Sequence, residues 1–318
     1  QRWLKQEPLS RCELVLVTQG GVAAAAADAV PGLWQAGLWG LLRSARSEHP
    51  DCPLRTLDLE AESARERVQA ALGVRDEPEL AVRGAEVLAP RLGVAQPGGE
   101  ALTLASGTVL LSGGTGELGR QVAVHLVRAH AVRKLLLLSR RGEQAAGAEK
   151  LRAELQQLGA QVTIAACDVS CRQQLAAQLQ ALPAAAPLCA VFHCAGVLDD
   201  GPVESLSSQQ LERVLYAKVD GAAHLDELTA ALPLQAFVLF SSVAGLLGTA
   251  GQANYAAANA WLDALAARRR AHGRAGQSLA WGLWEPAGEG MASRLRGPDL
   301  ERLQRQGVVP LSAAAALR

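Results

Sequence analysis

The feature that most constrains the fold is the octet S-G-G-T-G-E-L-G at residues 112–119, which stands between an apolar run and a helical pattern. The apolar run, Val109–Leu111, has the length of a buried strand, and residues 120–131 have helical periodicity. Three glycines spaced three residues apart permit a tight turn and a close backbone approach. Between a strand and a helix N-terminus, such a loop is typical of diphosphate-binding sites.

Further apolar runs of strand length recur downstream, separated by helical stretches. Because these runs are apolar on both faces and alternate with helices, they predict a parallel sheet covered by helices on both sides. This is the doubly wound α/β architecture. The predicted strands after the first are Leu135–Ser139, Val162–Ala166, Ala190–His193, Phe237–Phe240 and Leu279–Trp281.

The first third of the chain repeats the strand and helix alternation without the glycine loop. Leu14–Thr18 and Leu54–Leu59 predict strands and Trp34–His49 a helix, yet Gln19-Gly20-Gly21 leads into a run of alanines. We therefore predict two Rossmann-like, doubly wound parallel-sheet subdomains, of which the first is truncated and without cofactor. The predicted boundaries are residues 1–100 and 101–318, with a Pro/Gly-rich linker at about residues 90–107.

Composition excludes several function classes. Thirty-one basic residues balance 31 acidic ones, which gives no electrostatic argument for nucleic acid or an anionic membrane. Six scattered cysteines lack metal-ligand spacing, so we expect no metal site, reduced thiols and a reducing, cytoplasmic compartment. Residues 228–262 carry no formal charge, but Pro233 and polar residues favour a buried strand, loop and helix over a membrane span. No signal peptide is visible, and a start at Gln1 suggests a piece of a longer protein.

The end of the second downstream strand predicts which dinucleotide binds. Ser139-Arg140-Arg141 stands where an acidic residue would hold a ribose 2′-hydroxyl, and guanidinium groups favour a 2′-phosphate, hence NADPH. The alternative is that these arginines merely end a strand in an Arg-rich chain. Asp168 is a candidate for holding the adenine edge, and an N-cap of a helix at residues 170–182 is the alternative.

With the uncharged run and an upstream lysine, the chain closely resembles the ketoreductase domain of modular polyketide synthases, within the short-chain dehydrogenase/reductase superfamily. The resemblance covers nearly the whole sequence, and residues 35–50 resemble the family's structural subdomain. Six motifs come in the family's order: S-G-G-T-G-E-L-G, L-S-R-R, F-H-C-A-G-V-L-D-D, K-V-D-G-A, F-S-S-V-A-G and G-Q-A-N-Y-A-A-A-N-A. The chain departs from the family at its two ends.

The resemblance implies reduction of the β-keto group of a polyketide intermediate bound to an acyl carrier protein. Tyr255 would donate the proton, and Ser242 would hydrogen-bond the substrate carbonyl. The ammonium of Lys218 would lower the pKa of the Tyr255 phenol by favouring its anion, and would bind the nicotinamide ribose. Asn259, four residues after Tyr255 on the same helix face, stands where most of the superfamily has the lysine.

The same resemblance implies the configuration of the product. The triplet Leu198-Asp199-Asp200, with Leu247 in place of a tryptophan, marks the B-type, which delivers a D-β-hydroxyl, and Ala257 in place of proline makes it B1-like. The alternative for the two aspartates is a solvated turn. After the last strand, residues 281–284 lead into residues 286–290 and Met291, which resemble a mobile lid. The expected substrate and stereocontrol residues are Leu198, Asp199, Asp200, Leu247, Gln252, Trp281 and Met291.

Cofactor-binding residues are expected at the glycine loop and at the ends of the following strands. Partners would be the acyl carrier protein and neighbouring synthase domains. Two other functions remain open: a catalytically silent structural segment of a synthase, and a free-standing sugar-nucleotide epimerase or dehydrogenase. The expected cofactor-binding residues are Gly113, Gly114, Thr115, Gly116, Leu118, Gly119, Ser139, Arg140, Arg141, Asp168, Val169, Ala195 and Gly196.

Overall fold

The computed structural model describes residues 1, 3–5, 12–94, 104, 107–285 and 309–317. The chain forms two compact units, each assembled from three segments. Unit 1 comprises Gln1–Glu100, Asp199–Leu215 and Ser241–Ala280, and unit 2 comprises Ala101–Leu198, Tyr216–Phe240 and Trp281–Arg318. Unit 1 therefore contains the whole predicted first subdomain together with two later segments.

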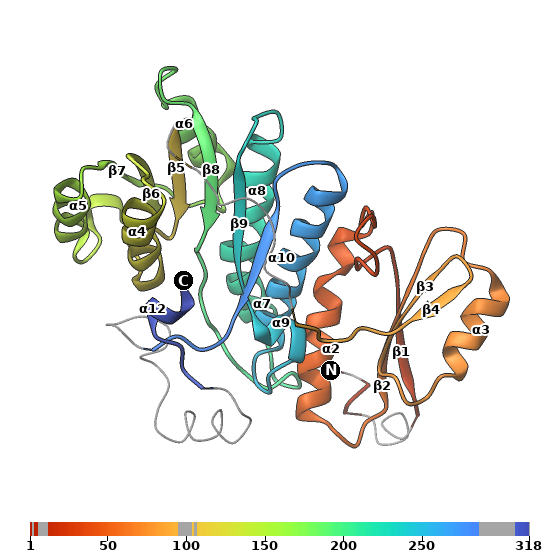
Figure 1. Cartoon of the computed structure of the whole chain (residues 1–318). Coiled ribbons are helices and arrows are strands. Elements are labelled where there is room, and N and C mark those ends of the chain that lie inside the picture. Colours follow the sequence, from red (N-terminus) through yellow and green to blue (C-terminus); the bar gives the residue numbers. More distant parts are fainter. Residues whose placement is uncertain (2, 6–11, 95–103, 105–106, 286–308, 318) are drawn as a thin grey trace. The chain divides into compact units, whose positions relative to one another are not determined.

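Unit 1 contains a four-stranded sheet in the order β1-β2-β3-β4, coloured red to orange in Figure 1. The first three strands are parallel and β4 is antiparallel. The elements are β1 (Leu14–Gln19), η1 (Leu33–Gln35), α2 (Gly37–Glu48), β2 (Leu54–Leu59), α3 (Arg65–Gly73), β3 (Glu79–Arg83), β4 (Glu86–Leu88), α7 (Ser208–Leu215), α9 (Val243–Leu247), α10 (Ala253–Ala271) and β10 (Gln277–Trp281), whose last residue belongs to unit 2.

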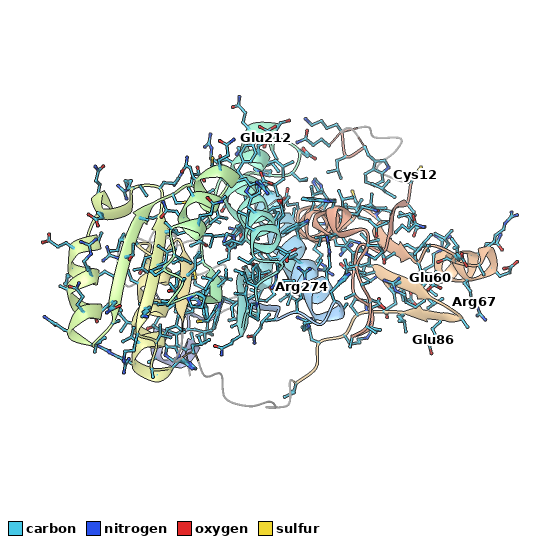
Figure 2. All side chains as sticks on the ribbon, turned by 90° about the horizontal axis from the view of Figure 1, so that it is seen from above. Cys12, Glu60, Arg67, Glu86, Glu212 and Arg274 are labelled. Atoms are coloured by element: carbon cyan, nitrogen blue, oxygen red, sulfur yellow. The ribbon has the colours of Figure 1, made fainter. Side chains whose placement is uncertain are left out.

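Helices α2 and α10 of this unit pack closely side by side (Figure 1). A Cβ on Gly40 of α2 would lie 2.1 Å from the Ala256 carbonyl oxygen of α10. The contact therefore requires a residue without a side chain. Figure 2 labels three charged side chains of this unit, Glu60, Arg67 and Glu86.

Unit 2 contains parallel strands in the order β9-β8-β5-β6-β7. Strands β5, β6 and β8 are almost entirely buried, which explains their continuous apolar runs. The elements are β5 (Thr108–Ser112), α4 (Glu117–Ala129), β6 (Lys134–Ser139), η2 (Gly142–Gln144), α5 (Ala148–Gln157), β7 (Gln161–Ala166), α6 (Arg172–Gln180), β8 (Leu188–His193), the π-helix η3 (Tyr216–Asp220), α8 (Gly221–Leu228), β9 (Ala236–Ser242), which ends in unit 1, and α12 (Ala313–Ala316).

These sheets confirm the predicted α/β fold with parallel strands. The uncharged run at residues 228–262 forms the end of α8, β9, the short helix α9 and the first half of α10. No helix within the described part of the chain is long and apolar enough to cross a membrane.

Candidate functional site

The glycine loop of unit 2 follows β5 and opens into α4. Gly113 has φ +66°, and a Cβ on it would lie 2.9 Å from the Ala195 backbone nitrogen. A Cβ on Gly119 would lie 2.3 Å from the Gly113 carbonyl oxygen. The N-cap residue of α4, Gly116, has no capping side chain. The first N–H groups of α4 are therefore not capped by the side chain of the N-cap residue, and the glycine backbone allows close approach, which fits a diphosphate.

The remaining predicted residues of this loop have structural positions consistent with its shape. Gly114 is buried, and a Cβ there would meet Leu137 of β6 at 2.9 Å. The Thr115 carbonyl accepts a hydrogen bond from Arg120 Nε at 3.0 Å. Leu118 lies in the first turn of α4 and is partly buried.

The pair Arg140 and Arg141 directly follows β6 and is exposed. Among the described residues, neither guanidinium takes part in a hydrogen bond or ion pair. Ser139 Oγ accepts a hydrogen bond from the Gly142 nitrogen at 3.1 Å, which tightens the turn after the strand.

Asp168 does not cap a helix, so that alternative reading was wrong. Helix α6 begins at Arg172 with Cys171 as its N-cap residue. The Asp168 carboxylate instead accepts hydrogen bonds from Ser170 N at 3.0 Å and Ser170 Oγ at 2.7 Å, a turn closed by an Asp side chain. Val169 is buried, and a Cβ on Gly221 would meet its Cγ2 atom at 2.8 Å.

A buried hydrogen-bond network in unit 2 links the glycine loop to Lys218. His193, the last residue of β8, is fully buried, with Nδ1 2.7 Å from Ser112 Oγ and Nε2 2.9 Å from the Lys218 carbonyl oxygen. A carbonyl only accepts, so Nε2 carries the proton and Nδ1 accepts from the Ser112 hydroxyl. Ser112 Oγ in turn accepts from Ala195 N at 3.3 Å. Burial and the nearby ammonium of Lys218 lower the pKa of His193 to about 3, so the ring is neutral.

Lys218 lies in the π-helix, a distortion that often marks functional residues. Its side chain is buried, and Nζ donates a hydrogen bond to the Phe240 carbonyl oxygen at 2.8 Å. Gly196 permits this path, because a Cβ there would lie 2.9 Å from Lys218 Cε.

Unit 1 brings Ser242, Tyr255 and Asn259 together. Ser242 ends β9 and caps α9, with Oγ accepting from Ala244 N at 3.2 Å. Tyr255 and Asn259 lie one turn apart on α10, and Asn259 Nδ2 donates to the Tyr255 carbonyl at 2.8 Å. The Tyr255 side chain also hydrogen-bonds with Ser242 and Asn259.

The pKa of the Tyr255 phenol is raised, opposite to the lowering expected from the sequence. Burial is the largest cause, hydrogen bonds with Asn259 and Ser242 act against it, and the negative charge of Asp200 adds to the rise. The phenol therefore holds its proton at neutral pH, as a proton donor must.

The expected stereocontrol residues lie at several places in the structure. Gln252 Nε2 donates to Asp200 Oδ2 at 2.8 Å, and Arg213 pairs with Asp199 at 2.7 Å. Leu247, at the end of α9, is 59% exposed. Leu198, in unit 2, is partly buried.

The aromatic segment expected before the lid is only partly described. The Trp281 ring contacts Phe240 and Trp284, with centroids 5.7 and 5.0 Å away. Met291 and the lid at residues 286–290 lie outside the described residues.

Two buried side chains of these networks had no role assigned from the sequence. His193 stood in an apolar strand, where a polar residue is itself a signal. Asn254 directly precedes Tyr255, is fully buried, and donates from Nδ2 to the Asp199 carbonyl at 2.8 Å and the Gln210 carbonyl at 3.2 Å. Its amide fixes the segment of the two aspartates against the start of α10.

Comparisons with known proteins agree over both halves of the chain. Residues 107–286 match the KR domain family, and residues 1–92 match the Rossmann fold domain of the polyketide synthase extender module SpnB. The polyketide synthase GfsA of Streptomyces halstedii is 49% identical over 100% of this chain, which spans 4% of that synthase. The spectinabilin polyketide synthase system protein NorA' of Streptomyces orinoci is 50% identical over 99% of this chain, which spans 8% of it.

A solved structure is similar over the same extent. "Structure of A-type Ketoreductases from Modular Polyketide Synthase" superposes with a TM-score of 0.90 at 46% identity, covering 99% of this chain and 66% of that one. The KR match alone spans more than half of the chain. This chain therefore belongs to the ketoreductase (KR) domain family of polyketide synthases, whose members are oxidoreductases.

Proposed function

We propose that this chain is an NADPH-dependent 3-ketoacyl-[acyl carrier protein] reductase that forms a D-β-hydroxyacyl thioester. The observation that carries the proposal is the Tyr255 phenol, which keeps its proton and hydrogen-bonds with both Ser242 and Asn259. Family membership supports the reaction class. Acyl carrier protein and neighbouring synthase domains as partners, and the cytoplasm as compartment, belong to the same proposal.

The chain's own residues supply the proton and the orientation of the ketone. The cofactor, when bound, supplies a hydride to the carbonyl carbon. Tyr255 Oη gives its proton to the carbonyl oxygen as negative charge develops there, and the Ser242 hydroxyl donates a hydrogen bond to the same oxygen. Asn259 keeps the Tyr255 side chain oriented through its hydrogen bond. Lys218 is assigned the family roles of binding the nicotinamide ribose and favouring the phenolate.

The residues proposed for NADPH have the chemistry that this cofactor needs. The glycine loop offers backbone N–H groups to the diphosphate, and Arg140 offers a guanidinium fork to the 2′-phosphate. Asp168 is proposed for the adenine edge. These residues and Lys218 belong to unit 2.

The D configuration rests on the Leu198-Asp199-Asp200 triplet and on Leu247. Similar solved structures carry A-type and C2-type titles, so configuration is a property to measure on this chain. Chiral chromatography of the reduced thioester gives the answer. Mainly L product would remove the B-type assignment and leave the reductase assignment intact.

The deciding experiment mixes the purified chain with NADPH and a β-ketoacyl thioester and follows loss of NADPH absorbance. We expect steady consumption and one molecule of hydroxyacyl product per NADPH. Binding of NADPH without consumption would favour a silent structural segment. Consumption only with a nucleotide sugar would favour the epimerase or dehydrogenase alternative.

A further inference from the structure

One carboxylate at the end of α2 contacts two distant segments of unit 1. Glu48 Oε2 accepts a hydrogen bond from Val203 N at 2.7 Å, and its Oε1 atom accepts one from Gly251 N at 2.9 Å. The donors lie 155 and 203 residues away in the sequence. Hydrogen bonds to an ionised acceptor are stronger than neutral ones, so this single side chain is an effective tie.

The two segments are also tied to each other beside the stereocontrol residues. Gly201 N donates to the Gly251 carbonyl at 2.8 Å, and Gly201 forms a β-bridge with Gln252. Gln252 Nε2 then reaches the Asp200 carboxylate at 2.8 Å. Glu48 thus holds the backbone on both sides of the Asp200–Gln252 contact.

In the glycine-containing segment after α9, the bond to Glu48 adds to two other backbone contacts: Thr249 N donates to Ser44 Oγ at 3.2 Å, and Gln252 N donates to the Thr249 carbonyl at 3.1 Å. Gly248 and Gly251 both have positive φ, +75° and +81°, and the residues between them are Thr249 and Ala250. Glycine in this region leaves the chain many alternative conformations. The Glu48 carboxylate, at the end of α2, stabilises one of these conformations by accepting from Gly251 N.

We propose that Glu48 is a positioning residue that sets the stereoselectivity of the ketone reduction by fixing the Asp200–Gln252 pair against the start of α10. Its carboxylate contacts backbone N–H groups of the two loops, and its effect on the product passes through Asp200 and Gln252. The inference rests on the proposed reductase function. It applies whichever hydroxyl configuration predominates, because it concerns how strictly one configuration is made.

The test is Glu48→Gln, which keeps size and one carbonyl acceptor but places an NH₂ donor against the second N–H. We expect the ratio of the two hydroxyacyl enantiomers to fall about tenfold, equivalent to about 1.4 kcal/mol. Total turnover should fall less than threefold, and the Kd for NADPH should stay within twofold, because the glycine loop is unchanged. The matched control is Glu86→Gln on β4, whose exposed side chain Figure 2 labels, and which should change none of these values.

A double-mutant cycle separates positioning from general destabilisation. If Glu48 acts through Asp200, then Glu48→Gln should change the enantiomer ratio little in an Asp200→Ala background. A full tenfold effect there, or an unchanged ratio in Glu48→Gln alone, overturns the inference. If Glu48→Gln does not fold, Glu48→Asp, which shortens the reach by one methylene, carries the same expectation. Failure of the wild type to reduce the thioester refutes the proposed function instead.

Discussion

The strand and glycine turn occur in both units, and the two turns differ in what their backbone N–H groups meet. In unit 2, the turn after β5 leads into α4 without a capping side chain. In unit 1, the turn after β1 is filled: Gly21 N donates to Asp58 Oδ1 at 2.7 Å, and Thr18 Oγ1 donates to the same oxygen at 2.6 Å. The buried Asp58 carboxylate therefore accepts from the kind of N–H and O–H donors that would bind a phosphate.

The Asp58 carboxylate belongs to a larger network of buried and partly buried polar side chains in unit 1. Arg83 pairs with Asp58 at 2.7 Å, and Trp39 Nε1 donates to Thr18 Oγ1 at 3.1 Å. Asp58 is fully buried, so its charge requires these partners. The comparison teaches that the N–H groups of such a turn can be satisfied inside the protein, here by a carboxylate of the next strand.

The prediction with the largest expected effect is Tyr255→Phe, which tests proton donation by unit 1 separately from cofactor binding by unit 2. Deleting only the phenolic proton donor should lower turnover about 1000-fold, since general acid catalysis contributes about 10² to 10⁴. The Kd for NADPH should be unchanged, because the proposed cofactor residues belong to unit 2. Turnover within about tenfold of the wild type, roughly 1.4 kcal/mol of barrier, would contradict the donor role.

Gly119→Ala in unit 2 tests the glycine loop against its counterpart. The new Cβ would meet the Gly113 carbonyl at 2.3 Å, and relieving such overpacking typically costs about 1–3 kcal/mol. We expect the Kd for NADPH, measured by fluorescence titration, to rise about thirtyfold. The matched change Gly21→Ala in unit 1 should leave that Kd unaltered. Equal effects of the two substitutions would remove the distinction between the turns.

The third prediction concerns the buried hydrogen-bond network around His193 in unit 2. This network is neutral at the histidine, whereas the Asp58–Arg83 network of unit 1 is ionic. The pKa of His193 is about 3 in the folded chain against 6.5 ordinarily, so the unfolded chain binds more protons. This stabilisation is present above pH 6.5 and is lost as the pH falls towards 3. At pH 5, which is 1.5 units below the ordinary histidine pKa of 6.5, the free energy of unfolding should be lower by about 2 kcal/mol.

Urea unfolding at pH 7 and pH 5 measures this loss. His193→Gln keeps a donor and an acceptor. In this variant the loss of unfolding free energy between pH 7 and pH 5 should be smaller by about 2 kcal/mol. An identical pH dependence in the variant and the wild type would show that the histidine is not held neutral.

The smallest expected effect concerns cofactor choice. Arg140→Ala should weaken NADPH about tenfold relative to NADH, because the guanidinium serves only the 2′-phosphate. The two Kd values give the ratio directly. An unchanged ratio would transfer the role to Arg141, which follows it in the same exposed turn.

The fold was predictable because its signals are local. Apolar runs located every described strand except β3 and β4, which were not predicted, and the glycine spacing located the turn before α4. The helix cap at Asp168 failed for a local reason too: the Ser170 amide and hydroxyl satisfy the carboxylate before the helix begins. The π-helix around Lys218 has no such pattern in its residues.

The supports of the candidate site were not predictable, because their partners are remote in sequence. Nothing near Glu48 indicates that it meets Val203 and Gly251. The raised pKa of Tyr255 likewise follows from burial, which depends on how the completed fold surrounds the phenol. The sequence identifies reacting groups by type, and tertiary packing decides their protonation and support.

The Asp58 carboxylate of β2, which accepts hydrogen bonds from the turn after β1, also has an evolutionary consequence. Replacing Asp58 alone would leave the partly buried charge of Arg83 with one partner fewer, and replacing Arg83 alone would leave the fully buried Asp58 carboxylate without its ion pair. Each of these single substitutions is therefore expected to lower the free energy of unfolding. Selection against such intermediates would make the turn after β1 change only when both partners change together.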